Sequence, residues 1–282
     1  MEVLRYTAFS TDPSGGNPAG VVLDATGLDD ATMLAVAAEV GYSETAYLLS
    51  RGDGRFGLRY FSPLAEVPFC GHATIATAVA HADRFGTGPM LLDTRAGEVP
   101  VSTVADGAGL VTATLTSVTP RSVPLDDDDR DRLLAALRWS SDDLDAALPL
   151  RVAYAGAWHP VVAVRDRDRL ADLDYDFDAL GALMAERDWT TVDLVWRSGP
   201  TAFDVRCPFP PGGVVEDPAT GAAAAALGGY LRELGLVDLP ATLALRQGAD
   251  MGRPSHLARR RGLGKYRCAC HTWSTGGRLV SR

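Results

Sequence analysis

Residues 69–82, FCGHATIATAVAHA, are the segment that most strongly indicates the fold. After its opening residues it contains almost only small and apolar side chains, and none of its residues is charged. A helix that is apolar on every side must be buried on every side. The stretch therefore predicts a central helix over residues 71–85, with strands packed around it.

The second half of the chain follows the same plan. EDPATGAAAAALGGYLREL, residues 216–234, predicts a second central helix over residues 218–235. Strand-like segments precede each helix, FGLRYFS at 56–62 and AFDVRCPFP at 202–210. We expect an α/β (α+β) protein of two similar lobes, residues 1–118 and 119–282, each a curved, mostly antiparallel sheet wrapped around its helix.

Composition excludes several classes of partner. The chain has 282 residues, of which 22% are charged, and a formal net charge of -9. This charge argues against nucleic-acid and anionic-membrane surfaces, which select for Lys and Arg. No apolar run approaches the roughly 18 residues of a membrane span. The first residues, MEVLRYTAFSTD, lack the features of a secretion signal. With only four cysteines, the sequence predicts a reduced, cytoplasmic protein.

Both predicted helices begin with glycine-containing segments, CGHAT and DPATGA. A helix start offers free N–H groups and a partial positive charge, and glycine lets a carboxylate approach the backbone. Two such starts would hold an anionic substrate without Lys or Arg. The alternative is that His72, Asp217 or Thr220 only caps its helix, with Pro218 in the first turn. Sequence alone leaves both interpretations open.

Five segments, in order, resemble one known family. They are SGGNPAGVVL (14–23), YSETAYLL (42–49), RYFSPLAEVPFCGHATIATA (59–78), EDPATGAAAAALGGYL (216–231) and QGADMGRPS (247–255). Together they resemble the PhzF-like family, named for the isomerase of phenazine biosynthesis, which has the diaminopimelate-epimerase-like fold. The resemblance implies an active site in the cleft between two lobes, no metal or organic cofactor, and a homodimer.

The resemblance also implies roles for individual residues. Glu44 would be the acid/base, assisted by His72 and Asp217. A carboxylate can take a proton from carbon and return it elsewhere, as an isomerase requires. The implied substrate-binding positions are Asn17, Gly71, Ala73, Gly221 and Ala222.

These roles predict a cofactor-independent isomerase or epimerase that moves a proton on a small carboxylate-bearing substrate. The alternatives are a lyase or hydrolase that uses the same cleft, and a non-catalytic binding protein of this fold. The phenazine enzyme has a serine where this chain has Ala222. That departure leaves the substrate open.

The cysteines suggest two further hypotheses, both disfavoured. Racemases of this fold use one cysteine at each helix start, but here only Cys70 precedes a central helix, and the nearest candidate for the other is Cys207. We therefore interpret Cys70 as a small buried residue. In the tail, Cys268, Cys270 and His271 lie too close in sequence and lack a fourth ligand, so we expect no metal site. The unusual tail after about residue 255 would either return to the first lobe or be atypical.

Overall fold

The computed structural model describes residues 1–238, 240–262, 265–274 and 279–280, with side chains as far as residue 257. The chain divides into two compact units. The first comprises Met1–Thr116 with Arg267–Arg282, and the second comprises Ser117–Tyr266. None of the helices in the described ranges is long and apolar enough to cross a bilayer.

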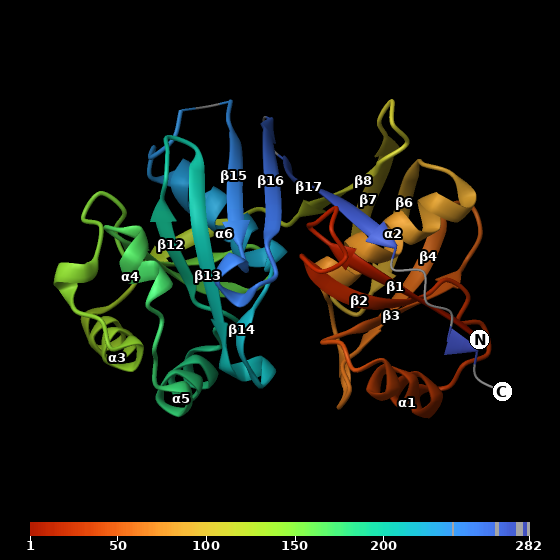
Figure 1. Ribbon diagram of the computed structural model, residues 1–282, viewed down its shortest axis with the longest axis horizontal. Coiled ribbons are helices and arrows are strands. Elements are labelled where there is room, and N and C mark those ends of the chain that lie inside the picture. The colour runs from red at the N-terminus through yellow and green to blue at the C-terminus, as the bar shows by residue number, and fades with distance from the viewer. Residues whose placement is uncertain (239, 263–264, 275–278, 281–282) are drawn as a thin grey trace. The chain divides into compact units, whose positions relative to one another are not determined.

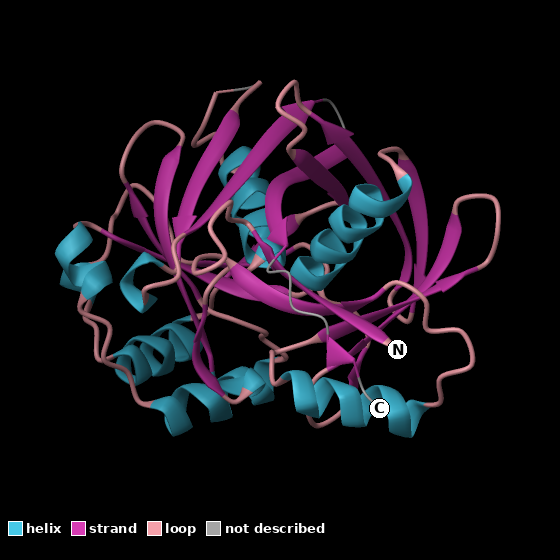
Figure 2. Ribbon diagram, turned by 45° about the vertical axis from the view of Figure 1, so that its right-hand side comes forward, coloured by secondary structure: helices cyan, strands magenta, loops and turns pink. Residues whose placement is uncertain are grey.

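The first unit is a curled sheet around one helix (Figures 1 and 2). Helix α2 (Gly71–Phe85) contacts strands on several sides, and α1 (Asp30–Val40) packs outside. The strands are β1 (Glu2–Ala8), β2 (Asn17–Val22), β3 (Thr45–Ser50), β4 (Arg55–Phe61), β5 (Glu66–Val67), β6 (Pro89–Thr94), β7 (Gly97–Ala105) and β8 (Val111–Ser117). β2 runs parallel to β3 and β4 parallel to β6, and the other pairs are antiparallel.

The second unit has the same construction around α6 (Gly221–Glu233). Its strands are β9 (Arg121–Pro124), β10 (Arg151–Tyr154), β11 (Trp158–Val164), β12 (Asp193–Arg197), β13 (Ala202–Phe209), β14 (Val214–Asp217), β15 (Thr242–Gln247) and β16 (Ser255–Gly262). Helices α3 (Asp127–Leu137), α4 (Arg167–Ala171) and α5 (Phe177–Arg187) and three short 3-10 turns, Ser141–Asp143, Pro210–Gly212 and Ala249–Met251, complete it.

The strand pairings show an internal repeat. From β1 to β7 the consecutive pairs are antiparallel, parallel, antiparallel, parallel and antiparallel. From β10 to β16, leaving out the β14 hairpin, the order is the same. Each central helix follows a two-stranded hairpin, β4–β5 or β13–β14. The predicted two-lobed, mostly antiparallel α+β fold is therefore confirmed, and the starts of α2 and α6 are topologically equivalent.

Both central helices are buried all round, as their composition predicts. Every residue from His72 to Ala80 is buried in α2, and every residue from Ala223 to Leu231 in α6. Small side chains are required where strands and loops approach closely. A methyl group at Gly229, for example, would lie 2.3 Å from the side chain of Pro120. The small residues of the central helices thus allow close helix–strand contact, and large side chains such as Tyr47 and Phe203 fill other parts of the two cores.

One helix boundary differs from expectation, whereas the tail pairs with the first unit, which is one of the two outcomes expected for it. The first central helix matches its predicted range, but the second begins at Gly221 rather than at 218 because β14 continues to Asp217. The tail forms β17 (Lys265–Ser274) and β18 (Leu279–Val280), which pair with β1 although little alternation marks them as strands. The tail is thus identified as strand by its backbone pairing with β1. The side chains of Cys268, Cys270 and His271, the weak metal-site candidates, lie outside the described residues.

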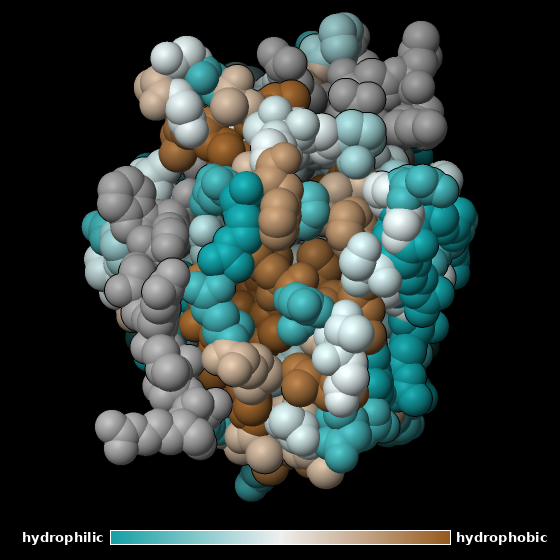
Figure 3. Space-filling model, turned by 90° about the vertical axis from the view of Figure 1, so that its right-hand side faces the viewer, coloured by the Kyte–Doolittle hydropathy of each residue, from teal (hydrophilic) through white to brown (hydrophobic). Residues whose placement is uncertain are grey.

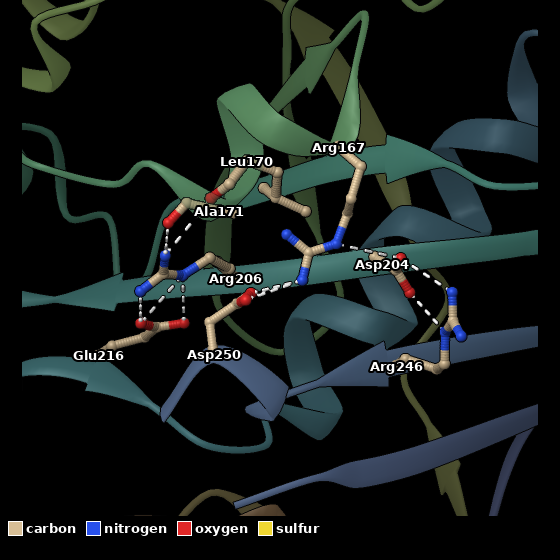
Figure 4. A network of polar contacts seen from close by, with 8 residues as sticks. All are labelled: Arg167, Leu170, Ala171, Asp204, Arg206, Glu216, Arg246 and Asp250. Carbon is tan, nitrogen blue, oxygen red and sulfur yellow. Dashed lines mark hydrogen bonds and ion pairs between the residues drawn. The ribbon is translucent and has the colours of Figure 1, made fainter. Parts of the chain in front are cut away.

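Ion pairs link β13 to β14, which leads to α6, and to β15, which follows it (Figure 4). Arg206 on β13 donates to Glu216 on β14, with 2.6 Å between Nη2 and Oε2, and to the carbonyl of Ala171. Arg246 on β15 pairs with Asp204 on β13, its Nη2 lying 2.9 Å from Oδ2. The side chains of Arg206 and Glu216 are 11% and 3% exposed, so this pair is nearly desolvated. The network fixes β14, which ends at Asp217.

Candidate functional site

Glu44, Cys70 and His72 form a cluster in the first unit. The Nε2 atom of His72 lies 3.4 Å from Oε2 of Glu44, and Ser43 Oγ lies at the same distance from Nε2. On its other side, the imidazole contacts the thiol of Cys70, with 3.3 Å between Sγ and Nδ1. Cys70 and His72 are buried, whereas the Glu44 side chain is 17% exposed. The imidazole thus links a partly accessible carboxylate to a buried thiol.

Local structure fixes the position of Glu44. Helix α1 ends at Val40 and is capped by Gly41, whose φ of 71° is readily adopted only by glycine. Strand β3 begins four residues after Gly41, at Thr45. The N–H of Gly20 on β2 donates to the carbonyl of Glu44 at 3.2 Å. A Cβ atom at Gly20 would lie 2.6 Å from the Thr45 hydroxyl, so only glycine permits this approach. Glu44 is therefore held by its backbone at one end of the β2–β3 pair.

The start of α2 has no side-chain cap among the described residues. Cys70 occupies the N-cap position but makes no side-chain hydrogen bond to the helix, and the first turn contains no acidic residue. His72 lies inside the helix, so the interpretation that it is the cap is wrong. The thiol of Cys70 turns towards the His72 ring instead of the backbone. Free N–H groups at such a start favour an anion.

The other candidate residues of this unit lie close by in the fold. Gly71 and Ala73 are in the first turn of α2, Gly71 partly exposed and Ala73 buried. Asn17 is buried as the first residue of β2, opposite Ala8 of β1. Because β2 and β3 are parallel, Asn17 and Glu44 lie at the same end of the pair.

In the second unit, Asp217 is held at the start of α6. The Thr220 hydroxyl donates to Oδ2 of Asp217 at 2.5 Å. Gln247 at the end of β15 accepts a hydrogen bond from the N–H of Thr220 at 3.0 Å and donates to the Asp217 carbonyl at 2.8 Å. These bonds keep residues 218–220 out of the helix, which explains its late start.

The capping alternative also fails for Asp217. Thr220 occupies the N-cap position, but no side chain caps the helix there. Asp217 lies three residues before the cap and binds the Thr220 hydroxyl. Gly221 and Ala222 begin the helix and are both partly exposed. The second unit therefore presents a carboxylate beside an open helix start.

The structure also explains why Cys207 is not a second thiol base. The N-cap of α6, equivalent to Cys70 of α2, is Thr220. Cys207 lies opposite Asp217 in the β13–β14 pair but is fully buried, and its Sγ faces Oδ1 of Asp193 at 3.7 Å. Burial, with the nearby Asp193 carboxylate, raises the pKa of the Cys207 thiol. A neutral, inaccessible thiol cannot exchange a proton with a substrate.

Sequence reasoning gave no role to three residues of these clusters: Ser43, Gln247 and Cys70 as a partner of His72. Ser43 and Gln247 both lie in segments that resemble the PhzF-like family, YSETAYLL and QGADMGRPS. Their contacts depend on which strands pair, since Gln247 lies 30 residues from Asp217 in sequence. The motifs therefore mark the segments that contain these residues, but they do not predict which residues the side chains contact.

Comparisons with known proteins agree on one family. The model for the family described as phenazine biosynthesis-like protein matches residues 6–268. An uncharacterized isomerase, YddE of Escherichia coli O157:H7, is 34% identical over 236 residues, which is 82% of this chain and 78% of that protein. The trans-2,3-dihydro-3-hydroxyanthranilate isomerase of Pseudomonas fluorescens is 32% identical over 251 residues, 88% of this chain and 86% of that one.

A solved structure extends this similarity to the whole fold. A predicted epimerase from Pseudomonas aeruginosa superposes with a TM-score of 0.86 at 28% identity, over 100% of this chain and 99% of that one.

Proposed function

Because the chain belongs to the phenazine biosynthesis-like (PhzF-like) protein family of isomerases, we propose that it moves a proton on a small carboxylate-bearing substrate without a cofactor. The observation that carries this proposal is the Glu44–His72 contact beside the open start of α2. It supports a carboxylate base next to a place where an anionic substrate can bind.

Glu44 is the acid/base in this proposal. Its carboxylate takes a proton from one carbon of the substrate and returns it to another, so no net change in composition results. His72 contacts the same carboxylate and positions it, and its two ring nitrogens let it accept one hydrogen bond while it donates another. A carboxylate with a fixed neighbour and partial access to solvent suits a single-base transfer.

The helix starts bind the substrate carboxylate. At α2 the backbone of Gly71 and Ala73 would donate, with Asn17 at the adjacent strand end. In the second unit, the backbone of Gly221 and Ala222 at the start of α6 would do the same, and the resemblance assigns Asp217 a supporting part in proton transfer. The open N-terminal turns support this assignment, because their N–H groups have no side-chain cap.

Two other functions remain as competing hypotheses. A lyase or hydrolase that used the same residues would lose or add water or another small molecule. A non-catalytic binding protein would bind the carboxylate but leave it unchanged. The chain's relatives of known name are isomerases, which favours the first proposal.

The assay follows the substrate of the named relative, trans-2,3-dihydro-3-hydroxyanthranilate, and a panel of small amino and hydroxy acids by chromatography and mass spectrometry. A product of unchanged mass that disappears in Glu44→Gln supports the isomerase. A mass change would favour the lyase or hydrolase. Binding that survives in Glu44→Gln, without any product from the wild-type chain, would favour the binding protein.

A homodimer and a cytoplasmic location stay predictions. The outer face of the first unit contains a central hydrophobic area bordered by hydrophilic residues (Figure 3). Large hydrophobic residues exposed in this unit include Leu64, Phe85 and Val104. Sedimentation velocity of the purified chain tests the dimer directly.

A further inference from the structure

The cluster at the start of α2 has the composition of a zinc site. Cys70, His72 and Glu44 each offer one ligand atom, and these atoms all lie within 4.8 Å of one another. Thiolate, imidazole and carboxylate are the ligands that Zn²⁺ takes in proteins, and a site with three protein ligands leaves a fourth position open. We propose that this cluster binds Zn²⁺ or a similar thiophilic divalent ion, and that the bound ion inhibits the enzyme.

The distances fit one ion. Bonds from zinc to sulfur of about 2.3 Å and to nitrogen or oxygen of about 2.0–2.1 Å give tetrahedral edges of roughly 3.6 Å for S–N and roughly 3.4 Å for N–O. The Sγ atom of Cys70 lies 3.9 Å from Nε2 of His72, and Nε2 lies 3.4 Å from Oε2 of Glu44. Both of these distances come within about 0.3 Å of those edges. The ligand atoms of Cys70 and Glu44 lie within 4.8 Å of each other, so a side-chain rotation that brings them closer completes the site.

The charge and the burial of the three ligands both affect how this site would bind a cation. The positive end of α2 opposes a cation, but a thiolate and a carboxylate supply two negative charges that neutralise Zn²⁺. Cys70 and His72 are 8% and 7% exposed, so their side chains are already held near the required geometry. Glu44 is the more accessible ligand and leaves an entry path. A sulfur ligand selects zinc, cadmium and cobalt over magnesium and calcium.

The inhibition part rests on the proposed function. An ion bound to Glu44 Oε2 and His72 Nε2 occupies the atoms that would transfer and support the proton. The ion is thus an inhibitor in competition with the reaction, not a cofactor.

Cobalt binding tests the site without a substrate. Titration of the full chain with Co²⁺ should give one equivalent with a thiolate-to-cobalt charge-transfer absorption, displaced by Zn²⁺. Cys70→Ser should abolish this absorption and weaken binding by more than roughly 100-fold, since even the loss of an outer partner of a ligand weakens binding by 10–100-fold. Glu44→Gln, at an accessible position, gives a second test and should weaken binding while the absorption persists at high Co²⁺.

Matched cysteine variants complete the experiment. Cys207→Ser changes the buried thiol of the second unit, and Cys268→Ser with Cys270→Ser removes the tail thiols. Both should bind Co²⁺ as the wild-type chain does. Absorption that survives in Cys70→Ser, or that disappears only with the tail cysteines, would overturn the site. If the chain binds Co²⁺ as expected but has no isomerase activity, the proposed reaction is wrong and the metal site stands. If the chain is active and Zn²⁺ leaves its activity unchanged, the inhibition is wrong and the reaction stands.

Discussion

Replacement of the buried Asp193 by Asn should remove a pH-dependent loss of stability. Asp193 is 0% exposed at the start of β12, and its Oδ2 atom has no hydrogen-bond partner among the residues that the structure describes. Burial raises the pKa of this carboxyl from 3.8 to about 7. The protonated form is therefore the stable one in the folded chain over most of the acidic range.

The raised pKa of Asp193 determines the sign and size of the pH dependence of stability. With a folded pKa above the unfolded one, the stability that the protonated carboxyl provides is complete below about pH 4. It is lost as the pH rises to about 7, because only the unfolded chain ionises freely in that interval. A shift of roughly three pKa units corresponds to about 4 kcal/mol. Asn cannot ionise, so the Asp193→Asn chain should gain up to about 4 kcal/mol relative to wild type between pH 4 and 8.

Urea unfolding at several pH values, followed by tryptophan fluorescence, measures this difference. Trp139, Trp158, Trp189 and Trp196 all lie in the second unit with Asp193, so the signal reports mainly on that unit. The amide adds donors at a site without a partner and costs about 1–3 kcal/mol at every pH. The test is therefore how the difference in unfolding free energy between Asp193→Asn and the wild type changes with pH, not the size of that difference at any one pH.

The exposed Asp188→Asn is the matched control, since it makes the same chemical change on the surface of the same unit. Its stability relative to wild type should stay constant with pH. A flat difference between Asp193→Asn and wild type from pH 4 to 8 would refute the reasoning that burial keeps Asp193 protonated.

Two further substitutions test how the start of α6 is held. Glu216→Ala leaves the guanidinium of Arg206 nearly buried without its partner and should cost about 3–5 kcal/mol in unfolding free energy, measured with urea; a loss below about 1 kcal/mol would contradict the pairing. Gly248→Ala would place a methyl group 2.4 Å from the carbonyl of Arg253 and should lower both thermal stability and turnover. Gly252→Ala has a similar positive φ but open space around it, so it should cost clearly less, and equal losses would refute the steric argument.

The fold was largely predictable because one residue pattern has one physical solution. A stretch such as 71–85, apolar on all sides and built from small residues, must be buried on all sides, and the strand-like segments around it in the sequence supply the elements that bury it. The repeat of this pattern at Ala223–Leu231 then predicted the second unit. The tail was harder to predict, because β17 is a strand through its backbone pairing with β1 and not through alternation of its side chains.

The site was predictable as a set of motifs but not as a set of contacts. Glu44 and His72 were expected to act together, and the structure brings them to 3.4 Å. The same structure pairs Cys207 with Asp217 across two strands and places Gln247 against the Asp217 carbonyl. Those neighbours are set by strand register over long sequence separations, which local patterns do not encode.

Incorporation of solvent deuterium tests the central claim most directly. The chain is incubated in D₂O with trans-2,3-dihydro-3-hydroxyanthranilate and the acid panel, and the product is examined by mass spectrometry and NMR. Proton transfer by Glu44 predicts deuterium at one carbon of an isomerised product with the wild-type chain and none with Glu44→Gln. Incorporation that persists at the wild-type rate in Glu44→Gln would contradict the claim that Glu44 transfers the proton.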